Sequence, residues 1–165
     1  MGATINLTEM EAADAGVQFR IKHPEPVLLG PVANGVNALF DKIFDSEGSY
    51  AGNAWAPLAP STMAKKARMG YPDVILVEKG DLRTSLVDPR GLTTTSLSSY
   101  GSGYVEMRDE QTLAVGSDDE AGFFHQGGTR FMPARPIAPD ADAIPSFDID
   151  AWTELVANFI LGDVF

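Results

Sequence analysis

The sequence predicts an α+β fold, in which a small antiparallel β-sheet packs with two main α-helices and several short helices. Apolar residues recur at intervals of three and four over residues 31–47 and again over 150–161, which indicates two amphipathic helices. Between them, residues 92–116 are rich in Thr, Ser, Tyr and Val and are divided by glycines, as is typical of a meander of short strands. Proline-rich stretches predict extended loop arms.

The length of 165 residues is that of one domain. We divide the chain into an N-terminal strand or arm, residues 1–30, and a single α+β domain, residues 31–165. In the arm, residues 17–21 alternate apolar and polar side chains and predict a strand, and residues 23–26 contain two prolines and predict a stiff linker. No apolar run approaches the roughly 18 residues that a membrane span needs, and the acidic N-terminus does not match a secretory signal.

The two main helices are predicted from their apolar faces. The first begins after Pro31 and ends before Gly48, and one stripe contains Val32, Val36, Leu39, Phe40, Ile43 and Phe44. The second begins at about Asp150, and its apolar face contains Trp152, Leu155, Val156, Phe159 and Ile160. Each stripe is wide enough to bury one side of its helix in a shared core.

Shorter elements are predicted between the main helices. A helix over residues 61–69 has Ser61 as its cap and Gly70 as its stop. Leu82 and Leu86 point inward from a helical turn, because they are four residues apart. Acidic residues at 118–120 open a short helix that reaches His125. Three strands of the meander are expected over residues 92–100, 104–108 and 112–115.

Residues with obvious catalytic or metal-binding chemistry are scarce. The chain has no cysteine, and its two histidines, His23 and His125, are about a hundred residues apart in no known metal-ligand spacing. It has neither a nucleophile elbow nor a glycine-rich phosphate loop. His125 either satisfies nearby backbone at a helix end or acts in acid–base catalysis, and the absence of a placed partner favours the structural role. We therefore expect no enzymatic activity, no cofactor and no metal.

The net charge of −11, from 12 basic and 23 acidic residues, is unfavourable for a nucleic-acid binder, because such proteins neutralise phosphates with Lys and Arg. An acidic surface would instead let DNA slide past without sticking. The alternative is that the charge only keeps the protein in solution.

Loops with large apolar groups are the most informative segments. Trp55 lies in a Gly/Pro-rich loop, so it either fills the base of the core or anchors against a partner subunit. Arg135 lies between prolines in residues 133–136, so it is either displayed on an inter-subunit arm or part of a connection over the protein's own surface. The subunit-interface candidates are Trp55, Pro57, Leu58, His125, Gln126, Pro133, Arg135 and Pro136.

An ordered set of motifs resembles the phage virion-morphogenesis family, which includes the tail-completion proteins of Mu-type phages and related head–tail joining proteins. The motifs are Trp55-x-Pro57-Leu58, Gly80-x-Leu82-x-x-Ser85, Phe124-His125-Gln126-x-Gly128 and Pro133-Ala-Arg-Pro136, followed by a terminal helix. The resemblance covers roughly residues 30–161. The order of the motifs is more specific than any one of them.

This resemblance implies a structural component of a bacteriophage virion at the head–tail junction, which joins or terminates the tail and has no catalytic activity. It implies a homo-oligomeric ring of six or twelve copies, with connector, terminator or tail-tube proteins as neighbours and DNA passing through without specific binding. Such a protein is assembled in the host bacterial cytoplasm, without a membrane. The alternatives are a minor capsid or head-decoration protein and, in a different class, a phage-encoded hydrolase.

Overall fold

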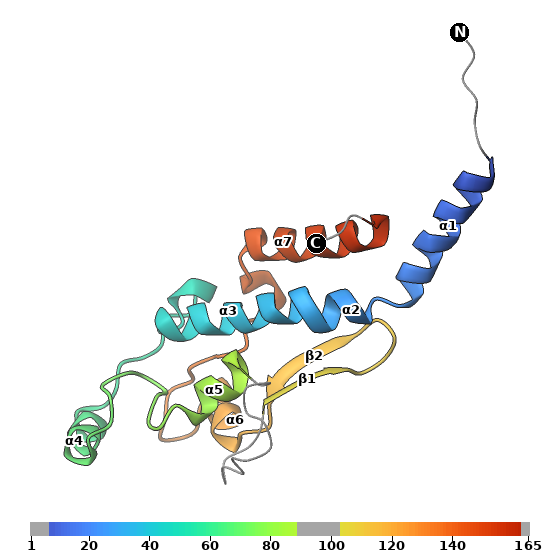
Figure 1. The fold of residues 1–165 in the computed structure, drawn as a ribbon. Helices are drawn as coiled ribbons and strands as arrows, with labels where there is room; N and C mark the ends of the chain where they lie inside the picture. The colour runs from blue at the N-terminus through green and yellow to red at the C-terminus, as the bar shows by residue number, and fades with distance from the viewer. Residues whose placement is uncertain (1–6, 89–102, 163–165) are drawn as a thin grey trace.

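The computed structural model describes residues 7–88 and 103–162, and its architecture is α+β, as the sequence predicts. A central helical rod, formed by α2, η1 and α3, has α7 on one side and α5, α6 and the β1–β2 hairpin on the other (Figure 1). At one end of the view α1 extends away from the rod, and at the other end α4 lies beyond the last turn of α3.

The central rod begins earlier than the sequence predicts. It comprises α2 (Glu25–Val27), the π-helical turn η1 (Leu28–Val32) and α3 (Ala33–Asp45). Of the linker expected at residues 23–26, only His23 and Pro24 connect the two helices. The second half is wrong, because the chain is already helical at Glu25 and a proline in the first helical turn costs no hydrogen bond. Pro31 lies inside η1, where Gly30 leaves helical geometry (φ −100°, ψ −105°). The division expected at residue 30 falls within this turn.

The N-terminal segment is helical, so the strand expected over residues 17–21 is wrong. Helix α1 (Leu7–Lys22) leaves Phe19 63% exposed, which shows that the alternating apolar residues do not face a core. The Arg20 Nε–H donates to the carbonyl of Ile160 in α7 at 2.8 Å. A lone strand would have needed a neighbouring strand for its backbone groups, whereas a helix satisfies them internally.

The core forms where α3 meets α5 (Asp81–Val87). The stripe predicted for the first main helix is confirmed, and the inward orientation of Leu82 and Leu86 is confirmed as well. The buried cluster consists of Leu39, Phe40, Ile43, Phe44, Ala51, Trp55, Ile75, Leu82, Leu86 and Ile137. At the edge of this contact, Arg83 forms ion pairs with Asp41 and Asp45 of α3.

Two of the three expected strands are confirmed. Strand β1 (Gly103–Met107) pairs antiparallel with β2 (Leu113–Ser117), and Val105 lies opposite Val115 in the register. The third strand, expected over residues 92–100, lies outside the described residues. The apolar side chains of the two strands are only partly buried, so the hairpin lies at the edge of the core and covers one side of it.

The shorter helices follow the predictions with one correction. Helix α4 (Pro60–Met69) ends at Gly70, which has φ +71°, but its cap is Ala59 rather than Ser61, because Pro60 takes the first helical position. The single turns η2 (Ser49–Ala51) and η3 (Ala141–Ala143) lie in the connecting loops. None of the described helices is both long enough and apolar enough to cross a membrane.

The last two helices close the fold around the core. Helix α6 (Glu120–Gly127) is capped by Asp119, which accepts from the N–H of Ala121 at 2.8 Å. Helix α7 (Ser146–Leu161) starts before the expected Asp150, and its predicted apolar face is half-buried against the central rod. A buried carboxylate anchors its first turn, because Asp148 accepts from Lys42 Nζ at 2.9 Å and from the Tyr50 hydroxyl at 2.8 Å.

Candidate functional site

Motifs that are far apart in the sequence meet in one place, which we call the loop junction (residues 55–57, Gln126 and residues 135–138). The Trp55 Nε1–H donates to the carbonyl of Pro136 at 2.8 Å. In return, Arg135 donates from Nε to the carbonyl of Ala56 at 2.9 Å and from a terminal nitrogen to that of Pro57 at 3.1 Å. Each of the two loops therefore donates hydrogen bonds to backbone carbonyls of the other. Loops need such donors because their carbonyls are not paired within a helix or sheet.

Gln126 joins the end of α6 to the same junction. Its Oε1 accepts from the N–H groups of Ile137 and Ala138 at 2.9 and 3.0 Å, and its Nε2 donates to the carbonyl of Ala138 at 2.7 Å. One position earlier, the carbonyl of His125 accepts from the N–H of Arg135 at 2.7 Å. The Gln126 side chain and the His125 carbonyl thus hold the backbone of the proline-rich segment in place.

Close approach of the chain to itself requires glycine at two positions near the loop junction, Gly48 and Gly128. At Gly128 (φ +70°), an added Cβ would lie 2.7 Å from the backbone nitrogen of Ala134. At Gly48 (φ +85°), an added Cβ would lie 2.6 Å from the Trp55 ring, which in turn packs edge-on against Phe44 with ring centroids 5.5 Å apart. Distances below 3.0 Å leave no room for any side chain.

The structure brings the eight interface candidates together, but it turns the two most prominent ones inward. Trp55 is 6% exposed and Arg135 is 5% exposed. Of the two alternatives for Arg135, display on an arm is corrected: its guanidinium donates to two carbonyls of the loop that contains Trp55, as in a connection over the protein's own surface. Leu58, His125 and Pro136 are half-buried, while Pro57, Gln126 and Pro133 are exposed. A role of these residues in subunit contacts remains a prediction.

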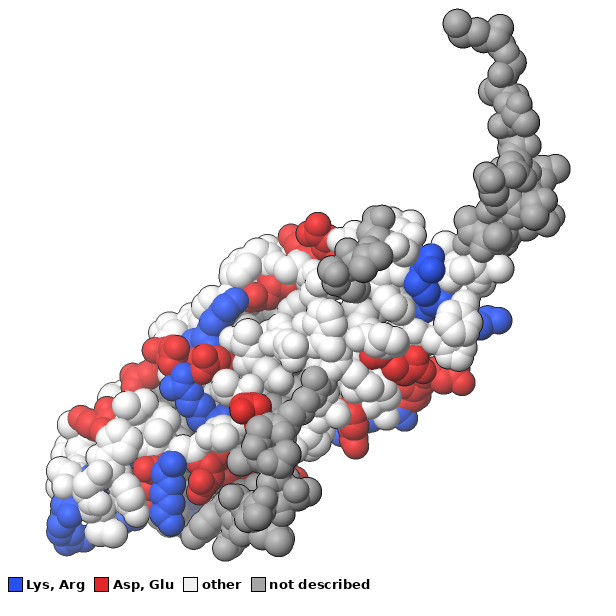
Figure 2. Space-filling view, in the orientation of Figure 1, with Lys and Arg blue, Asp and Glu red and all other residues white. Residues whose placement is uncertain are grey.

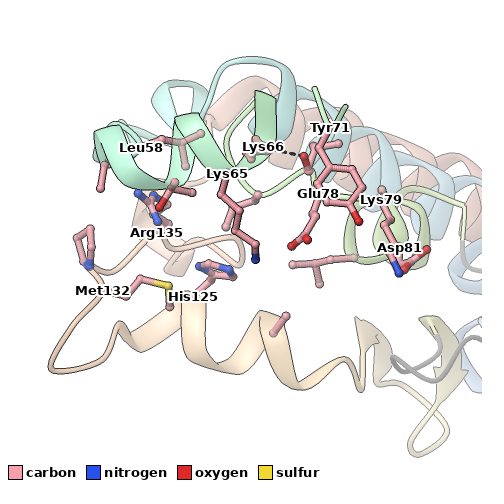
Figure 3. Close-up of a pocket in the computed structure, with 18 of the residues that line it drawn as sticks. Leu58, Lys65, Lys66, Tyr71, Glu78, Lys79, Asp81, His125, Met132 and Arg135 are labelled. Atoms are coloured by element: carbon pink, nitrogen blue, oxygen red, sulfur yellow. Dashed lines mark hydrogen bonds between the residues drawn. The ribbon is translucent and has the colours of Figure 1, made fainter. Parts of the chain in front are cut away.

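A groove of about 710 Å³, the first groove, lies between α4, the loop of residues 71–81 and α6. Lys65 from α4 and His125 from α6 point into it from opposite sides (Figure 3). One wall is fixed by Lys66, whose buried ammonium donates to the carbonyls of Val74 and Val77 at 2.5 and 2.8 Å. The lining of the groove has mixed charge, with Lys65 and Lys79 alongside Glu78 and Asp81.

The surroundings of His125 favour its neutral form. Burial lowers its pKa from the ordinary value of 6.5, the nearby charge of Arg135 lowers it further, and Asp119 only partly offsets this. Its buried Nδ1 has no hydrogen-bond partner within the described residues. An acid–base catalyst needs a nucleophile or an orienting carboxylate at hydrogen-bond distance. Over residues 7–88 and 103–162, no three His, Asp or Glu side chains form a group that could hold a metal ion.

A second groove, of about 580 Å³, lies on another side of α6, and its floor is the apolar core itself. Phe40, Leu82, Leu86, Val115 and Ile137 form this floor. Its rim includes Phe123, which is 80% exposed, and the carboxylate of Glu120. Sequence reasoning missed this feature. The available signal was the pair of adjacent aromatic residues in a short helix, Phe123 and Phe124, which are 80% and 48% exposed.

Charge is distributed without a continuous basic stripe on the face shown in Figure 2. Lys and Arg side chains on this face are separated by Asp and Glu. A protein that binds DNA through phosphates would gather its basic residues along one surface. This face therefore offers no extended surface for the DNA backbone.

Comparison with known proteins finds a phage-associated relative. The chain is 32% identical over 97 residues to "Mu-like prophage FluMu G protein 1" of Haemophilus influenzae. The match covers 59% of this chain and 56% of that protein, so the chain spans about half the length of the relative it matches. No family model matches the chain, and no solved structure does. The similarity supports a phage-associated family, as the motifs suggested, without specifying tail completion.

Proposed function

We propose that the protein is a non-enzymatic structural component of a bacteriophage virion, located at the head–tail junction, where it completes or terminates the tail. The observation that supports this most directly is the loop junction. There the side chains of the family-like motifs, Trp55, Gln126 and Arg135, bind backbone groups of the chain itself. The similarity to a protein of a Mu-like prophage agrees with a role in phage morphogenesis.

The protein acts, in this proposal, as one subunit of a homo-oligomeric ring of six or twelve copies, stacked on connector, terminator or tail-tube proteins. Large apolar side chains that remain exposed on the single chain support such contacts, above all Phe123 and Phe131. Its acidic surface suits a ring through which DNA passes without specific binding. Assembly takes place in the host bacterial cytoplasm, and the protein then resides in the virion.

Deleting the gene from the phage or prophage that encodes the chain tests this function. We expect filled heads and unattached or over-long tails to accumulate, and electron microscopy with an antibody to the protein should label the neck of complemented particles. Label over the whole shell would instead indicate a minor capsid or decoration protein. Normal, infectious particles without the protein would contradict both structural roles.

A phage-encoded hydrolase is the alternative from a different class. It predicts cell-wall degradation by the purified protein, and loss of that activity in His125→Ala with the fold intact. The structural proposal predicts no such activity in the wild type, and it predicts that the same substitution changes only stability or assembly.

A further inference from the structure

A tight turn beyond the end of α6 presents an exposed aromatic ring. Thr129 and Met132 exchange backbone hydrogen bonds of 2.8 and 3.2 Å, which leaves Arg130 and Phe131 at the apex. We call these two residues the tip. Phe131 is 90% exposed, and the Arg130 guanidinium lies 5.5 Å from the centre of its ring.

Hydrogen bonds within the chain hold the tip in a defined turn. The turn is closed on both sides by backbone hydrogen bonds, and the Phe131 N–H also donates to Thr129 Oγ1 at 3.3 Å. A preorganised turn loses little conformational entropy on binding, which favours its use as an anchor. Arg130 has no ion-pair partner among the residues that the structure describes.

The second groove has the complementary chemistry. Its apolar floor would take an aromatic ring, since a cavity of roughly 150 Å³ already suffices for benzene and this groove measures about 580 Å³. Its rim holds the exposed carboxylate of Glu120, which can pair with a guanidinium. Within its own chain the tip does not lie at the second groove. It borders the first groove, next to the side of α6 that contains Ala121 and His125.

We propose that the tip of one copy docks into the second groove of a neighbouring copy, with Phe131 on the apolar floor and Arg130 against Glu120. This inference rests on the proposed homo-oligomer and names its contact. A second copy is the occupant that charge complementarity favours, because this acidic chain places a basic residue beside the most exposed ring among the described residues and an acid on the rim of its apolar groove. Since tip and groove are different surfaces, the contact is head-to-tail and can close into a ring.

Cysteine trapping tests the contact directly, because the natural chain has no cysteine. In an Arg130→Cys, Ala138→Cys variant, one thiol lies at the tip beside the retained Phe131 ring and the other lies on the rim of the second groove, and both positions are exposed. Under mild oxidation, non-reducing gels should show a ladder of species beyond the dimer, up to the number of subunits in the ring. Each single variant should stop at the dimer. A double variant that remains monomeric, or that also stops at the dimer, would overturn the head-to-tail contact.

A charge swap provides a second, independent test by mass photometry or sedimentation velocity. Arg130→Glu and Glu120→Arg should each weaken self-association about 30-fold, and the variant with both changes should recover most of it, because every interface then regains an opposite pair. Phe131→Ala should weaken association at least about 30-fold, as expected for a buried aromatic anchor. Leu161→Ala and Arg68→Glu alter comparably exposed residues elsewhere and should have no effect.

The outcomes separate this contact from the proposed function. If the wild type associates and the tip variants associate equally well, the contact is wrong while a ring at the head–tail junction remains supported. If the wild type neither associates nor forms the disulfide ladder, the contact is overturned, and antibody labelling of particles decides the location independently. If the contact is correct but label is absent from the neck, the proposed function fails on its own.

Discussion

Two arginines five residues apart in the sequence have opposite environments. Arg135 is 5% exposed, and its guanidinium donates to the carbonyls of Ala56 and Pro57 in the loop junction. Arg130 is exposed on a tight turn, and its nearest aromatic neighbour is the exposed ring of Phe131. The comparison shows that the prominent motif residues hold the chain's own loops together, whereas the exposed surface beside them is the one that we propose for contacts between copies.

The largest effect is expected from removing the ring at the centre of the loop junction. Trp55→Ala should reduce the free energy of unfolding by about 3–5 kcal/mol, because it leaves a cavity beside Phe44 and an unsatisfied carbonyl at Pro136. Chemical denaturation followed by circular dichroism measures this change. Trp55→Phe retains most of the volume and should lose less. Equal stability of wild type and Trp55→Ala would mean that the junction does not stabilise the monomer.

Replacing the buried arginine should have the next largest effect. Arg135→Met keeps the length of the side chain but leaves the carbonyls of Ala56 and Pro57 without donors, at a cost of about 2–3 kcal/mol. Arg135→Lys should recover only part of this, because an ammonium cannot reproduce the planar guanidinium. Arg130→Met is the matched control at the tip, and we expect it to unfold at the same denaturant concentration as the wild type.

Gln126 should make a smaller contribution, because it is exposed and water can replace it. Gln126→Ala should lower the free energy of unfolding by about 1–2 kcal/mol, since the N–H groups of Ile137 and Ala138 lose their acceptor. Gln126→Glu keeps this acceptor and loses only the donor to the carbonyl of Ala138, so it should be intermediate. Hydrogen exchange at Ile137 and Ala138 should increase in Gln126→Ala and stay close to the wild-type rate in Gln126→Glu, which retains the acceptor. Unchanged exchange in Gln126→Ala would mean that Gln126 does not hold the backbone of Ile137 and Ala138 in place.

The pH dependence of stability should reveal the environment of His125. Burial, followed by the charge of Arg135, lowers its pKa in the folded state below the ordinary 6.5. As the pH falls below about 6.5, the unfolded chain therefore takes up this proton first and the free energy of unfolding decreases until the folded state is protonated as well. Relative to the wild type, His125→Gln should be less sensitive to pH in this range. A His23→Gln control distinguishes this from any general effect of removing a histidine.

The elements that the sequence predicted correctly are those whose residues repeat with a helical or strand period. The stripe of α3, the pair Leu82 and Leu86, and the β1–β2 hairpin follow from local pattern alone. The strand expected at residues 17–21 is wrong because so short an alternation also occurs in a helix, and α1 spans these residues. The contact of Arg20 with α7 could not be seen in the local pattern. Local pattern does not record distant partners.

The candidate site was predicted only in part for the same reason. Proline spacing indicated that Arg135 sits on a stiff, extended segment, but its direction depends on carbonyls 78 and 79 residues away. Nothing in the local sequence distinguishes an arginine that faces such carbonyls from one that faces solvent. The second groove was equally hidden, because its floor is assembled from four separate segments of the chain, at Phe40, Leu82, Val115 and Ile137.

The smallest effect on folding is expected at the tip. A small effect there would separate Arg130 most clearly from the buried Arg135. Phe131→Ala and Arg130→Glu should each change the free energy of unfolding by less than about 0.5 kcal/mol, because both side chains are exposed and contact little besides each other. Thermal unfolding at a protein concentration low enough to keep the chain monomeric measures this. A decrease of about 2 kcal/mol or more in the free energy of unfolding would mean that the tip stabilises the fold of its own chain. Arg130 would then have the same kind of role as Arg135, and the contrast between them would be wrong.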